Sequence, residues 1–299
     1  MLSLHTNNAA LSAQNSIGRT QSSLSTSQTR LSTGYRINSA MDDAAGLQIA
    51  TRLKTQTSGM TVAMRNTQNS VSLLQTAEGA LDETTNILTR MKDLATQSAD
   101  GSSTTDDKTA MQNEFNSLTA ELSNIISNTT FGGTKLFSTG ADAGKLTDKI
   151  TFQIGASSSE TMELDLKGDG ATTGITGMNT LIAAAAGGFK TDGTTTTYTG
   201  TEAELNTNAN STIDALKSAI DSVSSVRSSI GAAANRLDHV YNNLSNISTN
   251  TKAATGRIMD VDFATESANM TSSQMLLQAG TAMLKQSNSQ SSLVLSLLQ

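Results

Sequence analysis

An apolar residue recurs at every seventh position over a long stretch of the chain. The repeat starts at Leu53 and runs for six intervals, with Thr67 as its one polar member. Its members are Leu53, Met60, Thr67, Leu74, Leu81, Leu88 and Ala95. Seven residues make nearly two turns of an α-helix, so these side chains share one face, which needs other helices to cover it. The repeat therefore predicts one long helix within a bundle.

Two further segments show apolar residues that alternate at spacings of three and four. The shorter passes through Phe115 and Leu122, after a turn expected at 100–103, and the longer covers residues 213–244, with Arg227 as its interruption. Matching periods in separated segments predict a mainly α fold, a long antiparallel helical bundle or coiled coil. The residues expected along the bundle seam are Leu53, Met60, Leu74, Leu81, Leu88, Ile220, Val223, Ile230, Leu237 and Leu244.

The two ends of the chain carry repeats of the same kind, and we expect them to pair as terminal helices. Helices of this size and composition are marginal in isolation, because they bury too little to offset their conformational entropy. We therefore expect both ends to be disordered in a lone chain and to be covered by neighbouring copies in an assembly. The residues expected in this self-assembly core are Leu4, Leu11, Ile17, Leu24, Leu31, Phe263, Met270, Leu277, Leu284, Leu295 and Leu298.

The middle of the chain changes character near Gly132 and Gly133. Alternation of apolar and polar residues at 149–154 and 162–166 predicts a small β-hairpin region at about 131–167. Residues 168–209 are rich in Gly, Thr and Asn, so we expect a surface-exposed excursion, in which the apolar run 181–186 forms one or two helical turns.

Composition excludes several classes of function. The net charge is −6 and no basic cluster offsets it, which argues against nucleic-acid binding. There is no cysteine, and neither His5 nor His239 has a second metal-type ligand at helical spacing, so we expect no metal site, no cofactor and no catalysis. We find no stretch that predicts membrane insertion and no cleavable secretory signal at the N-terminus.

Several separated motifs resemble those of one family, the bacterial flagellins. Near the N-terminus they are Arg30-Leu31-Ser32-Thr33-Gly34, Arg36-Ile37-Asn38-Ser39-Ala40, Asp42-Asp43-Ala44-Ala45-Gly46 and Glu78-Gly79-Ala80-Leu81. Near the C-terminus they are Arg257-Ile258, Phe263-Ala264-Thr265-Glu266, Asn269-Met270, Gln278-Ala279-Gly280 and Leu295-Ser296-Leu297-Leu298. The resemblance covers about residues 1–140 and 210–299 and is that of a short form, with little or no outer variable domain.

The resemblance implies a domain organisation. Residues 1–43 and 256–299 would form the inner filament-core helices, as a terminal coiled coil. Residues 44–167 and 210–255 would form the outer helical bundle with the hairpin, and 168–209 the short variable excursion on the surface.

The resemblance also implies a function and partners. The chain would be a structural subunit, secreted through the flagellar type III export channel, that polymerises into the filament of the bacterial flagellum. Its partners would be copies of itself, an export chaperone, and the cap and hook-junction proteins. An animal Toll-like receptor would contact Arg90, Leu94 and Glu114, which occupy the corresponding positions.

Two alternatives remain open from the sequence. A flagellar hook-filament junction protein shares the terminal helices, although its middle is usually larger. A coiled-coil signalling module shares the long helical repeats, but the hairpin and the Thr-rich excursion argue against it.

Overall fold

The computed structural model describes residues 7–139, 143–168, 173–186, 205 and 208–297. In this part of the chain the helices are α1 (Asn8–Thr33), α2 (Ala44–Ser98), α3 (Thr105–Asn128), α4 (Gly174–Ala186), α6 (Ala209–Met259) and α7 (Phe263–Leu297). A single 3-10 turn, η1, spans Lys145–Thr147. The strands form two antiparallel hairpins, β1 (Thr130–Phe131) with β2 (Thr134–Lys135) and β3 (Ile150–Gln153) with β4 (Thr161–Leu164). The predicted fold class, mainly α with a small β region and paired terminal helices, is confirmed.

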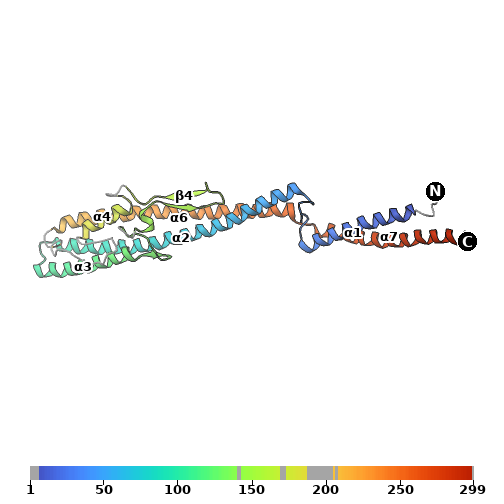
Figure 1. The fold of residues 1–299 in the computed structure, drawn as a ribbon. Coiled ribbons are helices and arrows are strands. Elements are labelled where there is room, and N and C mark those ends of the chain that lie inside the picture. The colour runs from blue at the N-terminus through green and yellow to red at the C-terminus, as the bar shows by residue number, and fades with distance from the viewer. Residues whose placement is uncertain (1–6, 140–142, 169–172, 187–204, 206–207, 298–299) are drawn as a thin grey trace. The chain divides into compact units, whose positions relative to one another are not determined.

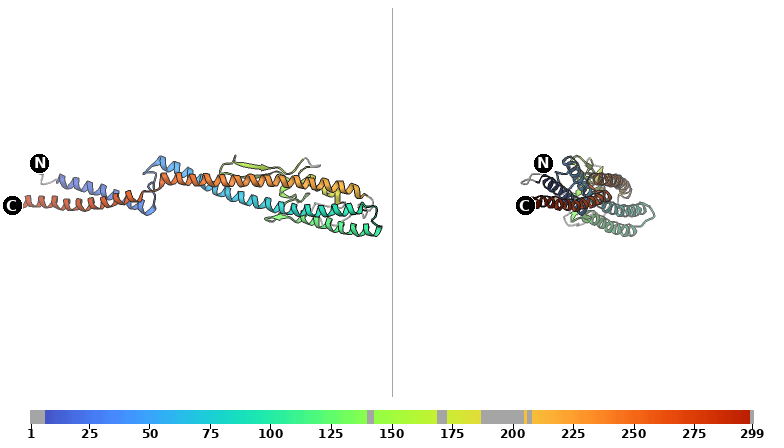
Figure 2. Two further views of the ribbon diagram at one scale, coloured as in Figure 1. Left: turned by 180° about the vertical axis from the view of Figure 1, so that it is seen from behind. Right: turned by 90° about the vertical axis from the view of Figure 1, so that its right-hand side faces the viewer.

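The chain divides into two compact units. The first consists of Met1–Thr57 and Thr249–Gln299, and the second of Ser58–Ser248. The second unit holds a continuous apolar core built from α2, α3, α4, α6 and the longer hairpin, and these elements run alongside one another in Figures 1 and 2.

The two long helices of the second unit, α2 and α6, run antiparallel. Arg227 of α6 contacts two carboxylates of α2, Asp82 at 2.9 Å and Glu78 at 3.5 Å, while Leu244 lies in a cluster with Met60. Arg227, which interrupts the apolar repeat, therefore pairs with acidic side chains of α2 instead of entering the core.

The polar member of the first repeat, Thr67, is buried without an unpaired hydroxyl. Its side chain is 1% exposed, and its Oγ1 donates to the carbonyl oxygen of Ala63 at 2.9 Å. A threonine hydroxyl that donates to a carbonyl oxygen of the preceding helical turn has its hydrogen bond satisfied within its own helix. The helix can therefore continue through this position at the packing face.

The start of α3 shows why the chain turns between α2 and α3. Oγ1 of Thr104 accepts from the backbone N–H of Asp107 at 3.2 Å, and the Asp107 carboxylate accepts from the N–H of Thr104 at 3.1 Å. This reciprocal pair is a capping box, which fixes the first turn of a helix. Phe115 and Leu122, on the inner face of α3, are fully buried.

The bundle seam residues predicted from the sequence lie at two depths. Leu53 and Ile220 are half-buried. The others are buried, namely Met60, Leu74, Leu81, Leu88, Val223, Ile230, Leu237 and Leu244.

The β region contains two hairpins where the sequence predicts one region at about 131–167. The first turns at Gly132 and Gly133, whose φ values of 59° and 81° favour glycine in a tight hairpin. Its strands have only two residues each, too short for an alternating pattern to reveal them.

Part of the segment expected to be an exposed excursion lies in the core instead. Helix α4 buries Ile175, Met178 and Ile182, because its apolar residues recur at spacings of three and four and so form one continuous face. The remainder of 168–209, apart from 168, 173, 205, 208 and 209, lies outside the described residues.

Candidate functional site

Helices α1 and α7 of the first unit pack side by side, antiparallel (Figure 1). At one end of the pair Nδ2 of Asn7 donates to the carbonyl oxygen of Ser287 at 3.2 Å. Toward the other end Oγ of Ser27 donates to Oε1 of Glu266 at 2.5 Å. These contacts join segments 280 and 239 residues apart, so the two ends of the chain meet in one element pair.

The seam between these helices is only partly covered. Ser27 is the buried residue of α1, and the apolar seam residues Ile17, Leu24, Leu31, Met270, Leu277 and Leu284 are half-buried. Leu11 and Phe263, also expected in the core, are each 56% exposed. Leu4 and Leu298 lie outside the described residues, as does the side chain of Leu295. A single copy therefore leaves much of the predicted self-assembly core uncovered.

The two helices approach each other closely at Gly280. A Cβ atom at this position would lie 2.9 Å from Cγ1 of Ile17 and 3.6 Å from its Cδ1. Glycine therefore permits α7 to pack directly on the branched side chain of α1.

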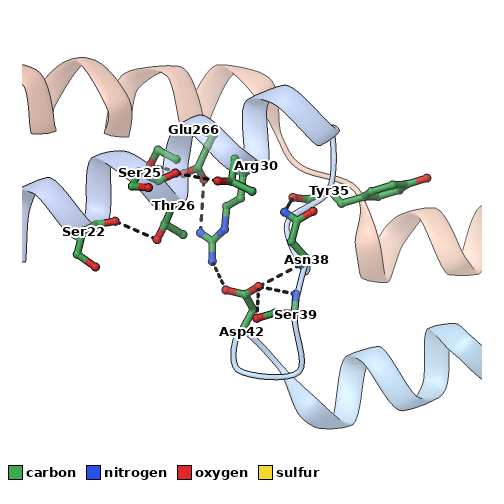
Figure 3. Close-up of polar contacts among 11 residues, drawn as sticks. Ser22, Ser25, Thr26, Arg30, Tyr35, Asn38, Ser39, Asp42 and Glu266 are labelled. Atoms are coloured by element: carbon green, nitrogen blue, oxygen red, sulfur yellow. Dashed lines mark hydrogen bonds and ion pairs between the residues drawn. The ribbon is translucent and has the colours of Figure 1, made fainter.

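A polar cluster lies where α1 ends (Figure 3). Arg30 reaches from α1 to two carboxylates, Glu266 of α7 at 3.7 Å and Asp42 of the following loop at 3.8 Å. Glu266 is 6% exposed, so its charge is held by Arg30 and by the hydroxyl of Ser27 rather than by water.

Hydrogen bonds hold Asp42 in its charged form. Its Oδ2 accepts from the backbone N–H groups of Ser39 at 2.9 Å and Asn38 at 3.1 Å, and also from the hydroxyl of Ser39. The bonds from Ser39 and Asn38, helped by the nearby charge of Arg30, lower the pKa of Asp42 below its ordinary value.

A second carboxylate of this kind begins α7. Asp262 accepts from the hydroxyl of Thr265 at 2.7 Å and from the backbone N–H of Ala264 at 3.0 Å. These two bonds, the first foremost, lower the pKa of Asp262.

A short backbone crossing fastens the end of α1 to the residues that precede α7. The N–H of Arg36 donates to the carbonyl oxygen of Met259 at 2.6 Å, and the N–H of Val261 donates to that of Gly34 at 3.0 Å. Gly34 ends α1 with a φ of 74°, a left-handed conformation that glycine adopts without strain.

Several exposed apolar side chains of this unit were missed by the sequence analysis. On α7 they are Met275, Leu276 and Met283, which are 60%, 59% and 66% exposed, and in the loop before α2 Met41 is 97% exposed. A count by sevens follows one face of a helix, whereas these residues of α7 lie on another. Apolar residues left over after the seam is assigned were the signal available in the sequence.

In the part of the chain that the structure describes, no three His, Asp or Glu side chains gather as metal ligands. In the same residues we find no helix with the length and apolar character needed to cross a bilayer. The candidate for function is the surface of the terminal pair, because it leaves apolar side chains such as Leu11, Phe263 and Leu276 more than half exposed.

Comparison with known proteins decides the family. The bacterial flagellin N-terminal helical region matches residues 4–142, and the C-terminal helical region matches residues 213–298. A flagellin of Halalkalibacterium halodurans is 38% identical over 270 residues, 90% of each chain. Polar flagellin B/D of Vibrio parahaemolyticus is 34% identical over 381 aligned positions, 99% of each chain. The chain belongs to the bacterial flagellin family.

As a flagellin, the chain is a structural subunit of the flagellar filament. A solved structure of a putative flagellar hook-associated protein from Vibrio parahaemolyticus shares the fold, with a TM-score of 0.57 over 73% of this chain and 100% of that one. At 18% identity that likeness concerns the fold alone.

The residues expected to meet an animal receptor lie in the second unit of this flagellin. Nη2 of Arg90 and Oε1 of Glu114 are 2.7 Å apart, and both side chains are about half exposed. Leu94 is 2% exposed and belongs to the core. The surface part of this candidate contact is therefore the pair Arg90 and Glu114.

Proposed function

We propose that the paired helices α1 and α7 are the surface through which copies of this flagellin polymerise into a hollow filament that turns as a propeller. The observation that supports this most is the incomplete cover of apolar side chains in the pair, where Leu11, Phe263 and Leu276 each expose more than half of their surface. Exposed apolar area of this kind is stabilised when another protein surface covers it.

The domain boundaries follow from the same proposal. Residues 1–43 and 256–299 line the tube as the inner core, and residues 44–167 and 210–255 form the outer bundle. The segment 168–209 faces outward, apart from the face that α4 buries. The well-buried core of the second unit supports its role as a rigid body that packs against neighbouring subunits laterally and along the filament axis.

The remaining partners are proposed from the family. The subunit leaves the cell through the flagellar type III export channel with an export chaperone, and it is added to a filament between cap and hook-junction proteins. A Toll-like receptor of an animal host contacts Arg90 and Glu114, for which their exposure is the support. A receptor reporter assay with Arg90→Ala and Glu114→Ala tests that contact, and signalling equal to the unchanged protein would contradict it.

Electron microscopy of the purified full chain tests the main proposal. We expect negatively stained samples to show long filaments once short seeds are added, and a soluble monomer when residues Leu293 to Gln299 are deleted. Filaments of normal length from the deleted chain would contradict the proposal. A single added layer that ends growth would instead identify a junction protein.

A point substitution with a matched control sharpens the test. Leu276→Gln places an amide on the exposed apolar surface of α7, so we expect slower seeded growth. Gln278→Ala, on an exposed polar position of the same helix, is the control and should grow at the normal rate. Equal growth of both variants would remove Leu276 from the assembly surface.

A further inference from the structure

The described methionines of this chain include a buried group and an exposed group, with Met64, Met111, Met259 and Met270 half-buried between them. The sequence has twelve methionines and no cysteine or tryptophan. Methionine therefore supplies all of its sulfur and is its most readily oxidised side chain. Met60, Met91, Met162 and Met178 are at most 5% exposed, whereas Met41, Met275 and Met283 are 97%, 60% and 66% exposed. An oxidant in solution reaches the second group directly.

Two of the exposed methionines share one face of α7. Met275 and Met283 are eight residues apart, which at 100° per residue places them about 80° apart around the helix and about 12 Å apart along it. Leu276 lies on the same side, so the three make an apolar strip on a face of the helix turned away from its half-buried seam residues. Both methionine side chains are flexible and more than half exposed.

We propose that Met275 and Met283 are sites of reversible oxidation by peroxides, and that the oxidised subunit is excluded from the polymer. The second half of this proposal rests on the proposed function. The modification itself concerns the free chain and stands apart from assembly.

The reaction needs only the thioether and the oxidant. A lone pair of the methionine sulfur attacks one oxygen of hydrogen peroxide, the O–O bond breaks and an S–O bond forms. The second oxygen takes up the proton released from the first and leaves as water. Sulfur loses two electrons and peroxide gains them, which gives methionine sulfoxide.

Oxidation changes what this face of α7 can join. A sulfoxide carries a strong bond dipole, and burying it against another subunit without a hydrogen-bond donor is unfavourable. Because the strip is uncovered in a single copy and covered in a polymer, peroxide reacts with waiting subunits and spares assembled ones. A methionine sulfoxide reductase restores the apolar side chain and with it the ability to assemble.

Peptide mass spectrometry of the full chain tests the modification. After brief exposure of the monomer to hydrogen peroxide, we expect the gain of one oxygen at Met275 and Met283 to be about tenfold faster than at Met91 and Met178, since reactivity follows exposure. Equal rates at the four positions would overturn the proposal. In seeded filaments the gain at Met275 and Met283 should fall to the rate of the buried pair, and an unchanged rate would overturn their cover by assembly.

Seeded growth after peroxide treatment tests the consequence. The double variant Met275→Leu with Met283→Leu keeps the strip apolar, so peroxide treatment should not change its growth rate relative to the same variant untreated. The unchanged chain should lose most of its growth rate on treatment until a sulfoxide reductase is added. Met41→Leu is the matched control, because Met41 is the most exposed methionine among the described residues but lies outside α7.

The outcomes separate this proposal from the proposed function. Protection by Met41→Leu alone, or normal growth of fully oxidised unchanged chain, would overturn the exclusion step while leaving assembly intact. Failure of the untreated chain to grow on seeds would contradict the proposed function and the exclusion step together. The oxidation sites would still be decided by the peptide rates in the monomer.

Discussion

At the scale of single residues, the terminal pair depends on one buried charge. Glu266 is 6% exposed and is shared by the hydroxyl of Ser27 and the guanidinium of Arg30, which also reaches Asp42. Figure 3 shows Arg30 between the two carboxylates. Such contacts fix the alignment of the two helices, because a shift along the axis would leave a charge buried without a partner.

Removal of this carboxylate should loosen the pair. In Glu266→Ala, Ser27 and Arg30 lose their shared acceptor, so we expect local unfolding of α1 to become easier by about 1 to 3 kcal/mol. Hydrogen exchange of the amides of α1 measures this. Glu121→Ala, at an exposed position of α3, is the control and should leave α1 unchanged. Identical exchange in the two variants would contradict the role of Glu266.

The loop around Asp42 should be sensitive to acid. The folded pKa of Asp42 is depressed below the ordinary value of 3.8, so its stabilisation is complete above that value and is lost as pH falls through the folded pKa. We expect the amides of Asn38 and Ser39, corrected for intrinsic exchange, to keep constant protection from pH 7 to about pH 5 and to lose it progressively in stronger acid.

Asp42→Asn isolates this dependence on pH. The amide side chain does not titrate, so the loop of this variant should show no acid-dependent loss from this position. A loss of the same size in both proteins would assign the effect to another group, of which Asp262, with its own lowered pKa, is the first to examine.

At the scale of helices and strands, the long helices and the hairpin of β3 and β4 were predictable, and the two-residue strands β1 and β2 were not. The seven-residue repeat through Leu74, Leu81 and Leu88 predicts α2 because each of these residues is buried in the same core. The hairpin of β1 and β2 has no such repeat, and its formation depends on the turn at Gly132 and Gly133.

The candidate site divides in the same way. The seam of α1 and α7 follows from spacing alone. The contact of Glu266 with Ser27 depends on how two helices 239 residues apart in sequence are aligned, which no local pattern states. The strip with Met275 and Met283 is exposed because no other part of the described chain covers it, and this becomes visible only in the structure.

Replacing glycine with alanine should have different effects on stability at two positions of the terminal helices. A Cβ on Gly18 meets nothing within 4 Å, so Gly18→Ala should stabilise α1 by about 1 kcal/mol through helix propensity. A Cβ on Gly280 would lie 2.9 Å from Ile17, so Gly280→Ala must displace that side chain and should lose the gain. Thermal unfolding followed by circular dichroism compares them, and equal stabilisation would show that the helices do not approach closely at Gly280.

At the scale of the whole molecule, the two units differ in what they bury. Most large apolar residues of the core, including Phe115 and Phe137, belong to the second unit, whereas Ser27 is the buried residue of α1. Stability is not uniform in such a chain, because regions with few buried contacts open at low cost.

This difference predicts a change in protection on assembly. In the monomer, amides of α3 and of the middle of α2 and α6 should resist hydrogen exchange, while those of α1 and α7 should be less protected and exchange faster. In seeded filaments α1 and α7 should become protected. Full protection of both helices in a stable monomer that refuses to polymerise would contradict the proposed function.

The pairing of the chain's two extremities also has a consequence in time. Asn7 bonds to Ser287, and Ser27 bonds to Glu266. Helix α1 can therefore pair with α7 only after nearly the whole chain has been made. Closing so large a loop is slow compared with local folding. A chain that ends before Glu266 lacks the partner of Ser27, so the pairing of α1 with α7 requires nearly the whole chain to be present.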